Sequence, residues 1–170
     1  QHVIGWQRAF SDSGFDIAAW RIHRCIGMGG DQIVTVLAGE DAERECGDAI
    51  RESEGGHYKS LIPEVKVVDG APKLVKKLKE AGRAVVLASS AKQDEVEHYV
   101  GLLDAAERID GFTSSADVDA TKPEPDLIEA ALEKAGTRRA VMVGDSVWDV
   151  ESASRAGIDS IAVLCGGFGE

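Results

Sequence analysis

Three short apolar runs in the second half of the sequence constrain the fold most. They cover residues 84–88, 140–143 and 158–164, and none of them alternates between apolar and polar residues. A strand that is buried on both faces has this pattern, whereas a strand with one solvated face alternates. Helical segments separate the runs, and buried strands that alternate with helices are typical of right-handed βαβ units. The sequence therefore predicts an α/β fold built on a parallel sheet.

The segments around these runs have the apolar spacing of amphipathic helices. The predicted helices cover residues 73–81, 95–103, 126–135 and 147–156. Glycines follow three of them, at Gly82, Gly136 and Gly157, where a helix favours a residue with a left-handed backbone. We therefore expect compact helix–strand units with short connections.

The pattern of apolar residues changes near Pro63. Residues before it show helical periodicity and no β-rich run, which predicts a small helical bundle. Asp16 and Asp31 are the expected N-caps of its second and third helices. We expect Trp6 and Trp20 to pack in its core. The predicted domains are a helical domain at residues 1–63 and an α/β domain at residues 64–170.

Polar side chains follow the predicted strands, where the ligands of parallel sheets bind. Ser89 and Ser90 end the first run, and Asp145 with Asp149 follows the second. Lys122 stands just before a predicted helix. Two carboxylates on one turn suit a hard cation such as Mg²⁺, while a hydroxyl and an ammonium suit a phosphate.

Each of these residues also has a plain structural interpretation. Ser89 or Asp145 could be a helix N-cap, Asp149 a first-turn acid and Lys122 a solvated surface side chain. What favours the chemical interpretation is that all of them fall at one edge of one predicted sheet.

Composition narrows the class of partner. Lys and Arg number 19 and Asp and Glu 30, which leaves a net charge of −11. Such a chain lacks the basic surface that nucleic acid or anionic lipid requires. The three scattered cysteines form no disulfide framework, and no signal peptide or apolar span is evident. We therefore expect a cytoplasmic protein that binds neither nucleic acid nor membrane.

The motifs resemble those of a known family. The sequences VVLASS at 85–90, KPEPD at 122–126 and VGDSVWD at 143–149 look like motifs two to four of the haloacid dehalogenase superfamily. They are most similar to its phosphoglycolate phosphatase and β-phosphoglucomutase branch. The resemblance implies a Rossmann-like core with an inserted helical cap, formed by residues 1–63. It also implies a Mg²⁺-dependent phosphatase that acts on a small phosphorylated metabolite.

The same resemblance assigns roles to individual residues. Ser89, assisted by Ser90, and Lys122 would bind the transferring phosphoryl group. Asp145 would coordinate Mg²⁺, and Asp149 would be a second ligand or would orient the site. In the cap, His23 and Arg24 would help to select the substrate.

One part of the family pattern is absent. The chain contains no Asp-x-Asp-Gly-Thr sequence, whose aspartates supply the nucleophile and the general acid/base. We expect the chain to be a portion of a longer enzyme that lacks the first strand and the C-terminal end of the core, and to be inactive by itself. The missing strand would leave a gap between the strands of Ser89 and Asp145.

Other functions stay open on the sequence. A phosphomutase or a haloacid dehalogenase has the same fold, although a dehalogenase has no need of the acidic pair. A non-catalytic binding module would explain the missing motif. The substrate and the oligomeric state are not readable from the residues.

Overall fold

The protein divides into two compact units. In a computed structural model, which describes residues 1–118 and 120–169, the units are Gln1–Val65 and Lys66–Glu170. The boundary lies two residues beyond Pro63, where the sequence changes character. The assignment of the first unit as a cap stays a prediction.

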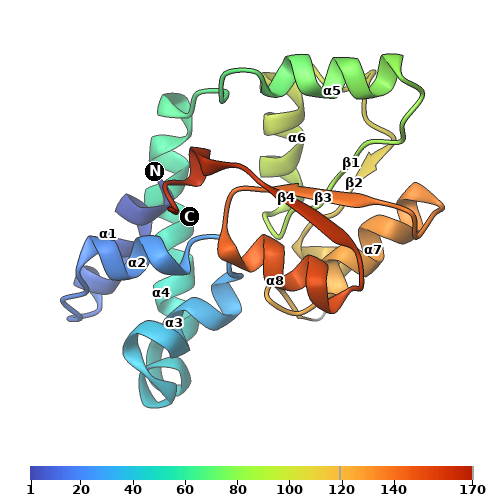
Figure 1. Cartoon of the computed structure of the whole chain (residues 1–170). Helices are drawn as coiled ribbons and strands as arrows, with labels where there is room; N and C mark the ends of the chain where they lie inside the picture. The colour runs from blue at the N-terminus through green and yellow to red at the C-terminus, as the bar shows by residue number, and fades with distance from the viewer. Residues whose placement is uncertain (119, 170) are drawn as a thin grey trace. The chain divides into compact units, whose positions relative to one another are not determined.

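The first unit is helical (Figure 1). It contains α1 (His2–Asp12), α2 (Ala19–Cys25), α3 (Gly30–Ala38), α4 (Glu40–Leu61) and the short 3₁₀ helix η1 (Ile62–Glu64). Helix α1 packs on α4 at Gly5, where an added Cβ would lie 3.6 Å from the Cβ of Tyr58. The largest buried side chains include Trp6, Phe10, Ile22, Val34, Ile50 and Tyr58.

Three expectations for this unit were wrong. Asp16 and Asp31 are not N-caps, because α2 begins after Ala18 and α3 after Gly29. Trp20 is 67% exposed instead of packed in the core, whereas Trp6 is buried as expected. A short helix such as α2 buries few of its residues, and Ile22 and Cys25 are the ones that face the core.

Within the described residues, the second unit contains four strands in two parallel pairs (Figure 1). They are β1 (Val86–Leu87), β2 (Gly111–Phe112), β3 (Val141–Gly144) and β4 (Asp159–Ala162). β1 pairs with β2, with Val86 opposite Gly111, and β3 pairs with β4, with Val143 opposite Ile161. Among the described residues no ladder joins β1 to β3.

The helices of this unit begin and end near their predicted positions. They are α5 (Ala71–Glu80), α6 (Gln93–Leu102), α7 (Asp126–Ala135) and α8 (Val147–Arg155), with the 3₁₀ helices η2 (Ser115–Asp117) and η3 (Leu164–Gly166). Gly82, Gly136 and Gly157 all have positive φ, as expected of residues that end helices. Ile128 and Leu132 of α7 form an apolar cluster with Ala156, against which Ala88 and Met142 pack.

Burial of β3 and β4 on both faces was a wrong expectation. Val141 and Val143 of β3 and Ile161 of β4 are 53%, 42% and 55% exposed. The register places these side chains on the same face of the strand pair, while Met142 points to the helices. One face of β3 therefore packs against the helices and its other face is open, while all four residues of β4 are exposed.

Candidate functional site

The turn between β3 and α8 is built around a capping box. Ser146 is the N-cap of α8, and its Oγ accepts a hydrogen bond of 3.2 Å from the backbone N–H of Asp149. In return, Oδ2 of Asp149 accepts hydrogen bonds from the backbone N–H and the hydroxyl of Ser146, at 3.1 and 2.8 Å. It also accepts one from the N–H of Asp145 at 3.2 Å. This reciprocal pattern fixes the turn that carries Asp145.

Glycine is required beside this box. A Cβ on Gly144 would lie 2.4 Å from the Cβ of Asp149, closer than two carbon atoms can approach. The carboxylate of Asp149 therefore folds back over the end of β3 only because residue 144 has no side chain.

Lys122 joins this turn to the end of β1. Its Nζ lies 2.7 Å from Oδ1 of Asp149 and 3.5 Å from the carbonyl oxygen of Ala88, which precedes Ser89. The side chains of Lys122 and Asp149 are only 10% and 8% exposed. The structure thus connects the segments of Ser89, Lys122 and Asp145 through one continuous set of contacts.

The electrostatics of the pair follow from these contacts. Burial of the Asp149 carboxylate raises its pKa, but the positive charge of Lys122 and the hydrogen bonds from Lys122 and Ser146 together outweigh that effect. The net result is a pKa below the ordinary value for an aspartate, so Asp149 is ionised at neutral pH and balances the charge of Lys122.

Helix α8 holds the segment of Lys122 at three successive points. Asp149, Ser152 and Arg155 lie on one face of the helix, at intervals of three residues. Ser152 is fully buried and donates a hydrogen bond of 2.9 Å to the backbone carbonyl of Glu124. Arg155 forms an ion pair of 2.6 Å with the side chain of the same glutamate. These contacts position residues 122–124 along α8.

Ser89 lies just after β1 and is held by its neighbours. Its backbone N–H donates to Oγ1 of Thr113 at 3.1 Å, and its own Oγ accepts from the N–H of Ala91 at 3.1 Å. Ser90 follows in the same loop and is half-buried. Both serines therefore lie at the edge of the sheet where the sequence places them.

The structure tests the plain structural interpretations of these residues as helix caps, a first-turn acid and a surface lysine. Helix α6 begins after Lys92, so Ser89 is not its N-cap, and the N-cap of α8 is Ser146, not Asp145. Lys122 is buried, not a solvated surface lysine. Asp149, in contrast, is a first-turn acid, as its structural interpretation proposed.

Asp145 is exposed beside the capping box. Its Oδ2 lies 3.6 Å from the thiol of Cys165, and Gly166 packs against its backbone. The described residues contain no cluster of three or more His, Cys, Asp or Glu side chains that could hold a metal. An exposed carboxylate at a strand end nevertheless fits Mg²⁺, which keeps several waters and needs only one or two protein carboxylates.

His23 and Arg24 occupy the last turn of α2 in the first unit. His23 is half-buried and Arg24 is exposed. Their part in substrate selection stays a prediction.

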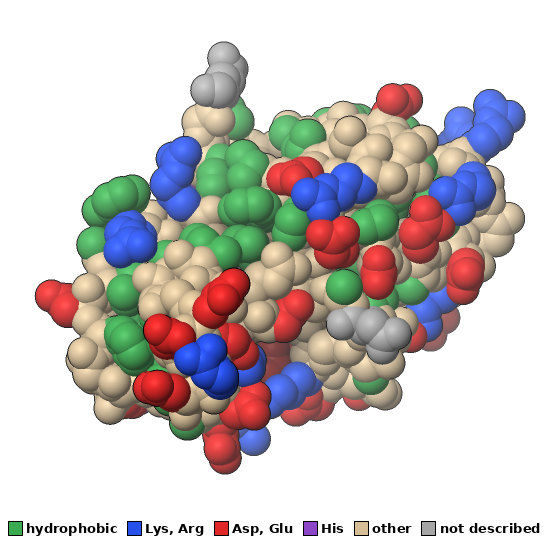
Figure 2. Space-filling model, turned by 90° about the horizontal axis from the view of Figure 1, so that it is seen from below, with side chains coloured by type: hydrophobic (Ala, Val, Ile, Leu, Met, Phe, Trp, Pro, Cys, Tyr) green, Lys and Arg blue, Asp and Glu red, His purple; other side chains and the backbone are tan. Residues whose placement is uncertain are grey.

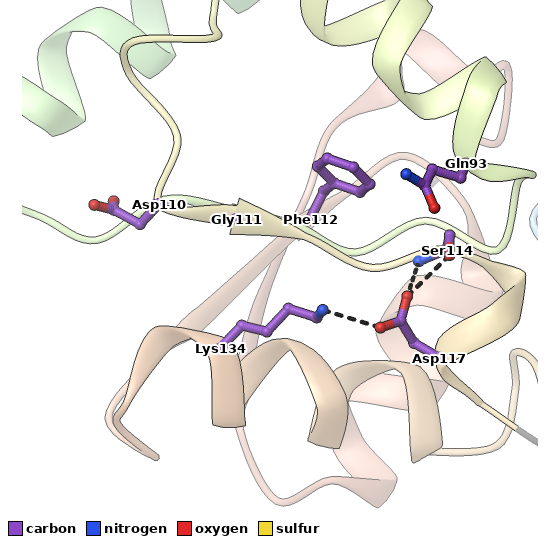
Figure 3. Close-up of a pocket in the computed structure, with 7 residues that line it drawn as sticks. All are labelled: Gln93, Asp110, Gly111, Phe112, Ser114, Asp117 and Lys134. Atoms are coloured by element: carbon purple, nitrogen blue, oxygen red, sulfur yellow. Dashed lines mark hydrogen bonds and ion pairs between the residues drawn. The ribbon is translucent and has the colours of Figure 1, made fainter.

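A hollow lies beside β2, on the surface of the β1–β2 strand pair (Figure 3). It encloses about 500 Å³ and is lined by Gln93, Asp110, Gly111, Phe112, Ser114, Asp117 and Lys134. Three of its polar residues are paired with one another, since Asp117 accepts hydrogen bonds from Ser114 and forms an ion pair of 2.9 Å with Lys134. The hollow includes none of the predicted site residues.

Three residues that hold the site were assigned no role from the sequence. Ser146 could have been found, because Ser-x-x-Asp before an apolar segment is a capping-box signal. Ser152 and Thr113 carried no such signal, since their partners are backbone atoms of segments distant in the sequence.

The distribution of charged side chains on the surface is consistent with the net negative charge of the sequence. On the face shown in Figure 2, acidic and basic side chains are intermixed and no continuous basic area is seen. Arg51, for example, forms ion pairs with both Glu43 and Asp48. None of the helices in the described part of the chain has the length and apolar character to cross a membrane.

Known proteins resemble this chain along most of its length. The model of the haloacid dehalogenase-like hydrolase family matches residues 4–163. Pyrophosphatase PpaX of Bacillus cereus (strain G9842) is 29% identical over 126 residues, which are 73% of this chain and 57% of that protein. The chain spans about half the length of the curated relatives it matches.

Solved structures share the fold. A hydrolase from Pseudomonas syringae matches with a TM-score of 0.91 and 28% identity, over 99% of this chain and 79% of that chain. A β-phosphoglucomutase from Clostridium difficile has a TM-score of 0.82 at 16% identity, over 95% and 76% of the two chains, and shows the fold alone. The predicted fold class and the resemblance drawn from the three motifs are confirmed. The chain belongs to the haloacid dehalogenase-like hydrolase family.

Proposed function

We propose that the protein is a Mg²⁺-dependent phosphatase that hydrolyses the phosphoric monoester of a small metabolite. The observation that carries the proposal is the buried ion pair of Lys122 and Asp149, which joins the segment of Ser89 to the turn of Asp145. Phosphoryl transfer depends mainly on positioning and on neutralisation of negative charge. A hydroxyl, an ammonium and a carboxylate at one sheet edge are suited to both tasks.

Each residue has a distinct part in this proposal. Ser89 donates its hydroxyl to a phosphoryl oxygen, with Ser90 beside it in the loop. Lys122 contributes a fixed positive charge, because its Nζ is held by Asp149 and by the carbonyl of Ala88. The aspartate nucleophile that the family resemblance implies is not assigned to any residue of this chain.

Asp145 is the proposed Mg²⁺ ligand, and Asp149 acts on the metal site through its contacts. Both oxygens of Asp149 are engaged, Oδ1 by Lys122 and Oδ2 by the Ser146 hydroxyl and two backbone N–H groups. Asp149 therefore orients Asp145 and Lys122. The bound cation would supply the positive charge that holds the phosphoryl oxygens beside Asp145.

The first unit is the proposed cap. A compact helical unit of its own can close over a substrate and exclude water during the reaction. His23 and Arg24, in the last turn of α2, are the proposed contacts to the part of the substrate that differs between metabolites.

The decisive experiment compares two aspartate variants of the full-length protein. Hydrolysis of p-nitrophenyl phosphate is measured as a function of Mg²⁺ concentration for the wild-type protein, Asp145→Asn and Asp159→Asn. Asp159 is an exposed aspartate at the opposite end of the β3–β4 pair, where the register places it beside Val141. We expect Asp145→Asn to reduce the Mg²⁺-dependent rate to background and Asp159→Asn to leave it unchanged. Full activity of Asp145→Asn would refute the metal assignment.

The substrate class is tested separately with a panel of phosphorylated metabolites. Pyrophosphate belongs in the panel, because the Bacillus cereus relative is named as a pyrophosphatase. A phosphatase releases inorganic phosphate from its substrate without a bisphosphate activator. A requirement for that activator would favour a phosphomutase instead.

A further inference from the structure

A buried hydroxyl joins the end of β2 to the end of β1. Thr113 follows β2 directly and is 0% exposed. Its backbone N–H donates to the carbonyl of Leu87 at 2.8 Å, which continues the β1–β2 ladder by one step. Its Oγ1 accepts a hydrogen bond of 3.1 Å from the N–H of Ser89 and donates one of 3.3 Å to the carbonyl of the same residue. The Thr113 side chain thus replaces backbone pairing at the point where the two strands end.

The backbone that Thr113 holds determines where the Ser89 hydroxyl lies. Oγ of Ser89 accepts from the N–H of Ala91, so hydroxyl and backbone turn form one unit. The carbonyl of Ala91 in turn accepts a hydrogen bond of 3.0 Å from the N–H of Ser115. Residues 89–91 are therefore tied twice to the segment that follows β2.

That segment is itself anchored on its far side. Ser114 and Asp117 form a capping box, in which Oδ2 of Asp117 accepts from the N–H and the hydroxyl of Ser114, at 2.8 and 2.9 Å. The other carboxylate oxygen pairs with Lys134 of α7 (Figure 3). Thr113 is thus placed between a ladder rung at Leu87 and a fixed turn at Ser114, so its hydroxyl has little freedom to move.

We propose that Thr113 is a positioning residue for phosphoryl transfer: its hydroxyl fixes the backbone of Ser89 so that the Ser89 hydroxyl meets the phosphoryl group. This inference rests on the proposed phosphatase function. Thr113 does not touch the substrate and acts through Ser89. A small displacement of a group that contacts the reacting atoms lowers the reaction rate strongly. Loss of the buried hydrogen bond between Thr113 and Ser89 should therefore reduce catalysis, because the Ser89 hydroxyl would move.

The test compares two substitutions that separate the hydroxyl from the volume of the side chain. Thr113→Val removes the hydroxyl and keeps the shape, and Thr113→Ser keeps the hydroxyl and removes a methyl group. In the full-length protein we expect Thr113→Val to lower kcat for p-nitrophenyl phosphate by at least about tenfold. KM should change by less than about threefold, because the group that binds the phosphate is still present. Thr113→Ser should keep kcat within about twofold of the wild-type value.

Thr137→Val is the matched control. Thr137 is exposed, and its hydroxyl accepts a hydrogen bond of 3.1 Å from the N–H of Arg139 in the same turn. The same chemical change there should leave both kinetic constants unchanged. A purely structural role of Thr113 would instead make activity follow thermal stability, and Thr113→Ser, which leaves a buried gap, would then be impaired as much as Thr113→Val. That result would overturn the proposal, as would a wild-type kcat for Thr113→Val.

Hydrogen exchange distinguishes this inference from the proposed function. The amide of Ser89 should exchange faster in Thr113→Val than in the wild-type protein, and at the wild-type rate in Thr113→Ser. If the wild-type enzyme and the Thr113→Val variant are both fully active, the role of Thr113 is contradicted but the phosphatase function is not. An inactive wild-type protein refutes the phosphatase function and with it the catalytic role, while unchanged exchange at Ser89 shows that Thr113 does not hold this backbone at all.

Discussion

Lys122 Nζ lies 2.7 Å from Oδ1 of Asp149, and both side chains are almost completely removed from water. The second unit contains a similar arrangement at the end of β2, where Lys134 pairs with Asp117 at 2.9 Å. In both places the aspartate is the fourth residue of a Ser-x-x-Asp capping box. The two pairs differ in exposure, since the side chains of Lys134 and Asp117 are 39% and 29% exposed. This difference makes each pair a control for the other.

Removal of Lys122 should therefore destabilise the protein more than removal of Lys134. Lys122→Met leaves the buried charge of Asp149 without its partner, and we expect a loss of about 3 kcal/mol in the free energy of unfolding. Lys134→Met removes a partly exposed partner, and we expect a loss of less than about 1 kcal/mol. Urea denaturation of the two variants measures both. Equal losses would show that the Lys122–Asp149 pair is solvated in solution.

The pair at β2 should determine part of the acid sensitivity. The hydrogen bond from Lys134 and those from the backbone and hydroxyl of Ser114 lower the pKa of Asp117 to about 2, from an ordinary value of 3.8. A lowered pKa stabilises the folded protein above the ordinary value, and this stabilisation is lost as the pH falls through the folded value. The stability advantage of the wild-type protein over Asp117→Asn should thus shrink from about pH 4 to about pH 2. Denaturation at several pH values tests this, and parallel curves for the two proteins would contradict it.

Gly166 packs closely against Asp145, so adding one methyl group at residue 166 should lower both stability and activity. A Cβ on Gly166 would lie 2.1 Å from the backbone oxygen of Asp145, so Gly166→Ala must displace one of the two segments. We expect a loss of about 1–3 kcal/mol in stability, together with a lower kcat. Thermal denaturation and the p-nitrophenyl phosphate assay measure the two effects.

Gly101→Ala is the control for that substitution. Gly101 lies in α6, and an added Cβ there meets nothing within 4 Å. Alanine is favoured over glycine in helices, so this variant should be more stable by about 0.5–1 kcal/mol. A Gly166→Ala protein as stable and active as Gly101→Ala would mean that the turn of η3 does not pack on Asp145.

The hydroxyl of Ser152 should contribute to stability through the segment of Lys122. Ser152→Ala leaves the carbonyl of Glu124 without its donor, and we expect a loss of about 1 kcal/mol. Ser154→Ala is the matched variant on the same helix, where the serine is exposed and the change should be neutral or slightly stabilising. Chemical denaturation distinguishes the two, and an equal response would show that the Ser152 hydrogen bond has no net value.

The sequence by itself determined the fold class and the positions of the polar side chains. Apolar runs, helical periodicity and terminating glycines are local signals, so α7 was predicted at the residues where it is found. Ser89, Lys122 and Asp145 could be placed at one sheet edge because the carboxyl ends of parallel strands meet there. Strand β2 was missed because two residues, Gly111 and Phe112, are too few to show a period.

Only the tertiary structure decided which residues are hydrogen-bond or ion-pair partners in the site. Lys122 contacts Asp149, Thr113 contacts Ser89 and Ser152 contacts Glu124, and 24 to 28 residues of chain separate the partners of each pair. The last two of these contacts use backbone atoms. Backbone donors and acceptors are the same in every residue, so a sequence does not reveal where they lie. The exposure of Trp20 and of Val141 was likewise set by which neighbours cover them, because an apolar side chain is buried only where another element packs against it.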